Sequence, residues 1–158
     1  MKVRVVAVGR PGALLAEAIA EYEARAGRYW SLEVVEVRAE RGGAARPPAD
    51  VMAREAERLR AALVPGLETI ALTREGRAWG SARLARHLDE LRVRAHPGAS
   101  FLIGGALGLE GALVRGATRR LSLSGMTLPH DMARLVLAEQ LYRAGTILRG
   151  EPYPTGYL

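Results

Sequence analysis

Apolar and polar positions recur with two different periods along the chain, and segments of the two kinds alternate. Alternating or β-branched apolar runs predict strands in five segments: 2–9, 32–37, 68–72, 100–103 and 120–123. Helical spacing of apolar residues, or a short run between breakers, predicts helices in five further segments: 14–27, 50–63, 81–95, 110–116 and 131–148. This alternation predicts an α/β fold, with a mostly parallel sheet and helices on both faces.

Polar residues at the helix starts indicate how those helices begin. Asp50 and Ser81 are expected to cap the helices that they open. Asp131 either caps the last helix or places an acid in its first turn. The buried face of that last helix is expected to consist of its apolar residues: Met132, Leu135, Val136, Leu141, Ala144, Ile147 and Leu148.

Three segments rich in Gly, Pro or Arg are expected to be irregular. Segment 38–48 is either a plain linker or a basic loop that faces RNA. Segment 73–80, which contains Trp79, is expected to be a loop. The tail from Arg149 carries two prolines and is expected not to be helical.

Composition limits the classes of protein to which the chain can belong. The chain has 158 residues, 49% of them hydrophobic and 25% charged, which suits one globular domain over residues 1–158. No apolar run approaches the roughly 20 residues that span a bilayer, so no membrane partner is expected. The opening residues predict a first strand rather than a signal peptide, and the absence of cysteine excludes disulfides and thiolate sites. A cytoplasmic location is the default expectation.

The charge balance is basic and consists almost entirely of arginine. The net charge is +6, and Lys2 is the only lysine. A basic surface favours a polyanion such as RNA, and guanidinium groups bind phosphates and stack on bases. The alternative is a surface that reflects coding bias or adaptation to heat.

The segment 121–143 contains the most informative break in regular structure. Gly125 and Pro129 interrupt it, and the loop between them carries apolar Met126 and Leu128. His130, one of three histidines, follows at the helix start. An apolar loop at the mouth of a sheet suits a flat, weakly polar ligand such as a purine base. The alternative is a buried connection with a helix-start histidine.

Loops that follow the strand ends at Leu72, Ile103 and Leu123 would meet at one edge of a parallel sheet, where ligands bind. The Gly104–Gly105 pair there lets backbone approach a ligand, or simply makes a tight turn. Neither a dinucleotide fingerprint, a phosphate-binding loop nor a hydrolase serine elbow is present. A site of backbone, one histidine and arginines suits a reaction driven by a reactive cosubstrate.

The other two histidines, His87 and His96, lack the spacing of metal ligands and are expected at the surface. No metal is therefore expected.

Four motifs closely resemble the RlmH family, and the opening KVRVVAVGR resembles the start of that family. The motifs are IGG-x-x-G from Ile103, LSLS-x-MTLPH from Leu121, AR-x-x-LAEQLYRA from Ala133, and PY at Pro152. The family consists of SPOUT-class methyltransferases that use S-adenosylmethionine to methylate N3 of a pseudouridine in large-subunit ribosomal RNA. The resemblance covers essentially the whole chain.

The resemblance implies more than the residue pattern does. It implies a trefoil knot over about residues 100–158, a homodimer in which the partner completes the active site, and the assembled ribosome as substrate. The donor-binding set carried over by position is Leu72, Gly104, Gly105, Gly108, Leu123, Ser124, Gly125, Met126, Thr127 and Leu128. His130 and Arg134 are the expected catalytic residues, and Tyr142 and Arg143 are expected near the pocket or the dimer seam.

The implied reaction is a direct displacement in which the N3–H of pseudouridine loses its proton and the nitrogen attacks the methyl carbon. Arg134 or a basic neighbour would stabilise the imide anion. His130 would act either as the base or only in orientation or helix-start hydrogen bonding.

The chain departs from the family pattern at Pro154 and Thr155, where the family has a histidine followed by a basic residue. The alternative functions are methylation of another RNA position and a non-catalytic module that binds RNA or the ribosome. A nucleotide-binding regulator is disfavoured by the missing phosphate-binding loop.

Overall fold

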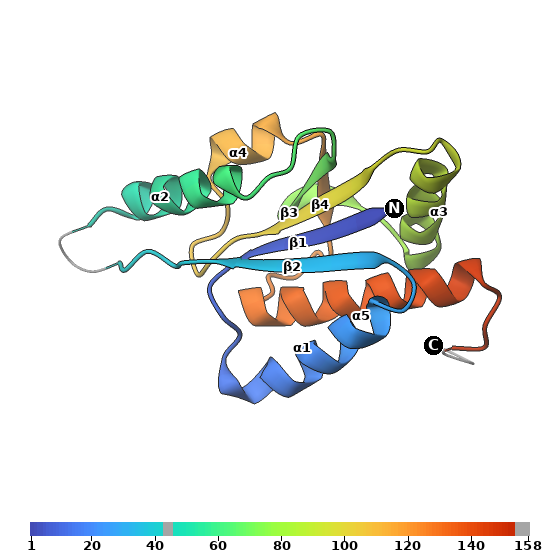
Figure 1. Cartoon of the computed structure of the whole chain (residues 1–158). Coiled ribbons are helices and arrows are strands. Elements are labelled where there is room, and N and C mark those ends of the chain that lie inside the picture. The colour runs from blue at the N-terminus through green and yellow to red at the C-terminus, as the bar shows by residue number, and fades with distance from the viewer. Residues whose placement is uncertain (43–45, 154–158) are drawn as a thin grey trace.

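Strands and helices alternate along the computed structural model, which describes residues 1–42 and 46–153 (Figure 1). In chain order the elements are β1 (Lys2–Val8), α1 (Ala13–Ala26), β2 (Ser31–Val37), α2 (Pro48–Ala61), β3 (Glu68–Ala78), α3 (Ser81–Val93), β4 (Gly98–Ile103), α4 (Gly111–Gly116), β5 (Arg119–Ser122) and α5 (His130–Leu148).

The five strands form one sheet in the order β2-β1-β4-β3-β5, and every adjacent pair is parallel. The central strand β4 is buried along its whole length, as expected for a continuous apolar run covered on both faces. The predicted α/β fold with a parallel sheet is confirmed.

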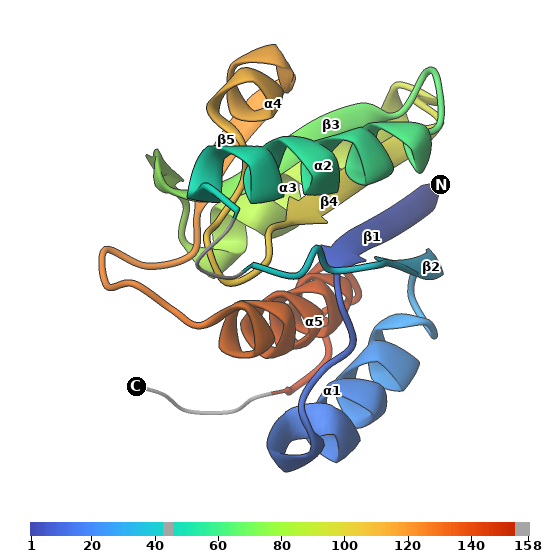
Figure 2. The ribbon, with the colours of Figure 1, turned by 90° about the vertical axis from the view of Figure 1, so that its left-hand side faces the viewer.

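Helices cover both faces of this sheet (Figure 2). On one face, α1, α3 and α5 enclose a core that includes Phe101, Leu88 and Leu137. On the other face, α2 and α4 enclose a smaller core around Leu59 and Leu102. Alternate residues of β4 thus belong to opposite cores, because successive side chains of a strand point to opposite faces.

β3 is longer than the sequence pattern predicted, and the prediction of a loop over 73–80 is wrong for most of that segment. The strand continues to Ala78, but its register with β5 shifts between Leu72 and Arg77. A Cβ atom on Gly76 would lie 2.7 Å from the backbone of Arg120 and Leu121, so only glycine fits this close approach to β5. Pairing with β5 therefore keeps the segment extended despite its weak strand pattern.

The predicted side-chain caps are wrong at two helices. Pro47 and Gly80 occupy the N-cap positions of α2 and α3 without a side-chain cap, and Asp50 and Ser81 lie inside the first turns. Pro48 at the start of α2 removes one of the unpaired N–H groups of the first turn, so that turn has one donor fewer to satisfy. Asp131 lies in the first turn of α5, which confirms one of its two alternatives.

The buried face of α5 differs from the predicted one. Leu141 and Ala144 are buried as expected, but Met132, Ile147 and Leu148 are exposed. The buried set also contains Arg134, Leu137, Ala138, Gly145 and Thr146. A Cβ atom on Gly145 would lie 2.3 Å from the ring of Tyr29, so small residues let α5 pack closely and set its orientation.

The predicted surface position of His87 is also wrong. Its side chain is buried, and its Nε2 lies 2.8 Å from Glu68 Oε1. Arg119 donates to the same oxygen at 2.7 Å, and the Trp79 ring packs against the imidazole. Burial raises the pKa of Glu68, but the His87 hydrogen bond and Arg119 outweigh it and hold that pKa below its usual range. His96 is partly exposed, and its Nδ1 accepts from the Gly98 N–H.

The described chain ends beside α5. Tyr153 packs its ring against Tyr142 and donates to Glu139 at 3.2 Å. No helix follows Leu148 up to residue 153, as predicted; positions 154–158, including Pro154 and Thr155, lie outside the described residues. Across ranges 1–42 and 46–153, no helix combines the length and apolar character needed to cross a membrane.

Candidate active site

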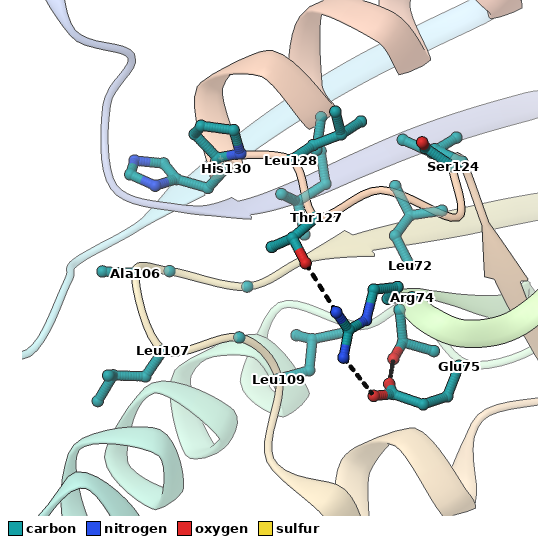
Figure 3. Close-up of a pocket in the computed structure, with 18 of the residues that line it drawn as sticks. Leu72, Arg74, Glu75, Ala106, Leu107, Leu109, Ser124, Thr127, Leu128 and His130 are labelled. Atoms are coloured by element: carbon teal, nitrogen blue, oxygen red, sulfur yellow. Dashed lines mark hydrogen bonds and ion pairs between the residues drawn. The ribbon is translucent and has the colours of Figure 1, made fainter.

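A pocket of about 800 Å³ lies where the register-shifted part of β3 meets the loops after β4 and β5, at the carboxyl edge of the sheet (Figure 3). This is the edge that the sequence predicted, because parallel strands present their carboxyl ends together. Most of the predicted donor-binding residues line it: Leu72, Gly104, Gly105, Gly108, Leu123, Ser124, Met126, Thr127 and Leu128. Gly125 does not contribute to the lining.

The glycines after β4 form a tight backbone wall. The Gly108 N–H donates to the Gly105 carbonyl at 3.0 Å, and Gly108 has φ +85°, a conformation that favours glycine. A Cβ atom on Gly104 would lie 2.6 Å from the carbonyl carbon of Gly108. A side chain at Gly104 would therefore force this loop apart, and glycine lets its backbone fold tightly beside the pocket.

Serine hydroxyls hold the loop after β5. Ser122 donates to the Ser124 carbonyl at 2.8 Å, and Ser124 Oγ accepts from the Met126 N–H at 2.9 Å. These local bonds satisfy backbone groups that no strand or helix pairs. They leave Met126 with 80% of its surface exposed, at the rim of the pocket.

The segment of β3 at its register shift forms a charged wall. Arg74 donates to Thr127 Oγ1 at 2.9 Å, and Thr73 donates to Glu75 at 2.6 Å (Figure 3). The Thr73 hydrogen bond is the main cause that holds the pKa of Glu75 below its usual range. The sequence placed the segment after Leu72 at the ligand edge but singled out none of these three residues, because they belong to no recognised motif. Their place directly after the predicted strand end at Leu72 was the available signal.

His130, the first residue of α5, lines the opposite side of the pocket from Arg74 and Glu75 (Figure 3). Its Nε2 lies 3.2 Å from Asp131 Oδ1. The other oxygen of Asp131 accepts from the Gly12 N–H at 2.7 Å, which ties the β1–α1 turn to the start of α5. The imidazole is therefore partly exposed to a ligand while its carboxylate neighbour is anchored.

Arg134, one turn further along α5, does not line the pocket. Its guanidinium donates to Glu23 of α1 at 2.9 and 3.2 Å and to Glu36 of β2 at 2.6 Å. Burial lowers the pKa of Arg134, but the two carboxylates outweigh it and raise that pKa, so the cation stays charged. Within this chain it acts as a link between three elements.

Tyr142 and Arg143 do not line the pocket either. Tyr142 packs against the rings of Tyr22, Tyr29 and Tyr153, and Arg143 donates to Glu139 at 2.5 Å. The predicted donor-binding residues, with the exception of Gly125, thus line the pocket, whereas Arg134, Tyr142 and Arg143 lie outside its lining. The donor-binding and catalytic roles, and a place for Tyr142 and Arg143 at a dimer seam, stay predictions.

Apart from the charged pair Arg74 and Glu75 and the titratable His130, the lining consists of apolar, glycine and hydroxyl-bearing residues, which suits a nucleoside-like ligand better than a polyphosphate. Within the part of the chain that the structure describes, no group of three or more His, Asp or Glu side chains could hold a metal ion. The volume falls within the usual range for small-molecule sites. Leucines and backbone dominate the surface, which agrees with a nucleoside-like ligand.

The fold and pocket define a parallel α/β domain with a small-molecule site at the carboxyl edge of its sheet. Its backbone resembles that of a probable methyltransferase from Bordetella pertussis, with a TM-score of 0.56 at 19% identity over 90% of this chain and 95% of the other. The family model described as "Predicted SPOUT methyltransferase" matches residues 1–154. The chain therefore belongs to the SPOUT methyltransferase family.

Similar sequences share a single description. A protein of Gemmatimonas aurantiaca is 51% identical over 155 residues, which cover 97% of this chain and 99% of that protein. A protein of Rhodospirillum rubrum is 47% identical over 154 residues, covering 97% and 98%. Both are described as ribosomal RNA large subunit methyltransferase H. The resemblance seen in the motifs is confirmed along nearly the whole chain.

Proposed function

We propose that this methyltransferase transfers a methyl group from S-adenosylmethionine to N3 of a pseudouridine in large-subunit ribosomal RNA. Its substrate is the RNA within the assembled ribosome, in the cytoplasm. The observation that carries the proposal is the pocket itself, built by β3 and the loops after β4 and β5 in a chain that aligns nearly end to end with the named relatives. A basic net charge of +6 supports an RNA substrate.

The residues present fit the methyl donor. The apolar side chains of Leu72 on β3 and of Leu123 and Leu128 in the loop after β5 offer surfaces for an adenine ring. The backbone at Gly104 offers groups for the edge of that ring and for ribose. The donor carries no phosphate, so a neutral backbone wall is sufficient. When bound, it supplies an electrophilic methyl carbon, and the protein's task is to orient the nucleophile and handle one proton.

His130 is the residue proposed to handle that proton. It lines the pocket, and imidazole is the side-chain group that enzymes use most often for general acid–base catalysis. Its Nε2 faces Asp131, so the carboxylate can orient the ring and compensate the charge of an imidazolium. The alternative role is orientation of the target nucleotide by hydrogen bonding, without proton transfer.

Arg134 is proposed to act from behind the pocket. Its ion pairs with Glu23 and Glu36 fix the helix that begins at His130. A direct contact with the imide anion would require the guanidinium to leave these carboxylates. The cation that faces the anion is therefore proposed to come from elsewhere, either a basic group of this chain or one of a partner chain.

A homodimer is proposed as the working form. Leu107 and Met126 at the pocket and Leu14 on α1 expose large apolar surfaces, with Leu14 93% exposed. Such side chains favour burial against a second copy of the chain. The site would then be completed by the partner, and sedimentation at micromolar concentration is expected to give twice the mass of one chain.

The decisive experiment uses a labelled methyl donor. Ribosomes from cells that lack this activity are mixed with the protein, in the presence or absence of the pseudouridine synthase that prepares the site. Label that enters large-subunit RNA only when pseudouridine is present supports donor, substrate and target together.

Two outcomes would contradict parts of the proposal. Label that does not depend on pseudouridine would keep the methyltransferase and discard the target. Absence of label despite measurable donor binding would indicate another RNA, with free transfer RNA as the next substrate to test.

A further inference from the structure

The register shift in β3 places two opposite charges on one wall of the pocket. Arg74 and Glu75 follow Leu72, where β3 loses its regular pairing with β5. Gly76 closes this irregular segment by packing directly against the β5 backbone. The position of both charged residues is therefore set by the sheet and not by a free loop.

Both side chains are held in place but remain open to a ligand. The Arg74 guanidinium donates one hydrogen bond to Thr127, and its Nη2 lies 4.0 Å from Glu75 Oε1. Their side chains are 60% and 78% exposed. An ion pair of this length and exposure contributes little to stability, and it leaves guanidinium donors available.

These charges differ from the rest of the lining. Among the described residues that line the pocket, Arg74 and Glu75 are the two that carry full charges at neutral pH, and His130 is the remaining titratable one. The other lining residues are apolar, glycine or hydroxyl-bearing. A ligand that fits this pocket should thus be mostly neutral, with one anionic and one cationic group close together at one end.

We propose that Arg74 and Glu75 form the subsite for the amino-acid end of the methyl donor, with Arg74 binding its carboxylate and Glu75 its ammonium group. This inference rests on the proposed donor binding. A guanidinium binds a carboxylate through two parallel N–H donors, which a lysine ammonium does not reproduce. The existing hydrogen bond to Thr127 orients the Arg74 fork toward the loop that binds the rest of the donor.

The test compares two ligands that differ at this end. S-adenosylhomocysteine carries the amino-acid group, whereas 5′-methylthioadenosine keeps the nucleoside and thioether and lacks it. By calorimetry, Arg74→Ala is expected to weaken S-adenosylhomocysteine about tenfold, as for loss of a charge-assisted hydrogen bond, and to leave 5′-methylthioadenosine unchanged. Arg74→Lys should recover only part of the loss, and Glu75→Gln should cause a smaller loss confined to the same ligand.

Two control variants test whether the loss of affinity in Arg74→Ala comes from its positive charge or from a change in the pocket wall. Arg77→Ala removes an exposed arginine of the same strand that does not line the pocket, and it should bind both ligands as the wild type does. Thr127→Val removes the hydrogen-bond partner and keeps the guanidinium. If the charge itself binds the carboxylate, Thr127→Val should lose less S-adenosylhomocysteine affinity than Arg74→Ala.

The binding measurements distinguish failure of the Arg74–Glu75 subsite from failure of the proposed donor binding. A wild-type protein that binds neither ligand would refute the donor pocket itself. Normal wild-type binding of both ligands, with Arg74→Ala losing neither or losing both equally, would refute only the subsite. A variant with normal donor affinity and a raised KM for ribosomes would instead assign Arg74 to an RNA phosphate and overturn the proposal.

Discussion

Arg74 and Arg134 show how different two arginines near one site can be. Arg134 is 7% exposed and bound by two carboxylates from separate elements, whereas Arg74 is largely exposed and only loosely paired with its neighbour. A buried, fully paired cation holds elements together, and its removal leaves its carboxylate partners buried without a counter-charge. An exposed cation in a pocket costs the fold little and remains available to a ligand. The comparison indicates that Arg134 stabilises the frame of the site and Arg74 belongs to its surface.

Among the residues that line the pocket, His130 is the one whose substitution by alanine should have the largest effect on turnover. If His130 is the base, turnover on ribosomes should fall by about 10²–10⁴-fold, the usual contribution of general base catalysis. Affinity for S-adenosylhomocysteine should stay unchanged, because the histidine lies across the pocket from the charged wall. Turnover close to that of the wild type would end the base role and leave only orientation.

Arg134→Ala tests whether the buried arginine behind the pocket stabilises the fold. Leaving Glu23 and Glu36 without their partner should lower the free energy of unfolding by about 3 kcal/mol. That corresponds to a fall in Tm of roughly 6–12 °C for a chain of this size. Arg92→Ala, which breaks an exposed pair with Asp89, is the control and should cost at most about 0.5 kcal/mol. A variant as stable as the wild type but inactive would return Arg134 to a catalytic role.

Gly104→Ala changes the pocket wall without changing any charge. The new methyl group would lie within 2.6–2.9 Å of the backbone of Gly108 and Leu109, so the loop must open. We expect S-adenosylhomocysteine affinity to fall at least about tenfold, since small displacements in a site are costly. Gly116→Ala, where a Cβ atom meets nothing within 4 Å, is the matched control. Equal donor affinity in both variants would mean that this wall does not contact the donor.

Glu68→Gln examines a second buried cluster, away from the pocket. The pKa of Glu68 is lower in the folded chain than in the unfolded one, so its carboxylate stabilises the fold above pH about 4.3 and less as pH falls below that value. The variant should lose about 1–3 kcal/mol of stability at pH 7. Its difference from the wild type should shrink as pH falls through the lowered pKa of Glu68. Glu90→Gln, on an exposed pair with Arg83, is the control for urea unfolding across pH. A difference that stays constant with pH would exclude this linkage.

Much of the fold followed from local pattern. The strands at β1, β2, β4 and β5 are apolar runs whose pattern identifies them without reference to the rest of the chain. Their parallel arrangement then places the loops after β4 and β5, together with the segment after Leu72, at one edge of the sheet. The knot and the dimer stay predictions. The apolar periodicity of single segments gives no information about how the chain threads or which copies associate.

The predictions that failed depend on partners distant in sequence. The extended conformation after Leu72 depends on Gly76 meeting β5, and the burial of His87 depends on Glu68. The ion pairs of Arg134 also depend on distant partners, because its own helix gives no sign of the carboxylates of α1 and β2. Its catalytic role stays a prediction.

The central position of β4 has a consequence for how the chain is made. β4 is the fourth strand to be synthesised, yet it lies between β1 and β3 and joins them. Before it emerges, β1 can pair only with β2, and the β1 and β3 edges that β4 will join stay open. Open apolar edges attract strands of other chains. We therefore expect fragments that end before Gly98 to aggregate. A nascent chain of that length should need protection from other chains until β4 has been synthesised.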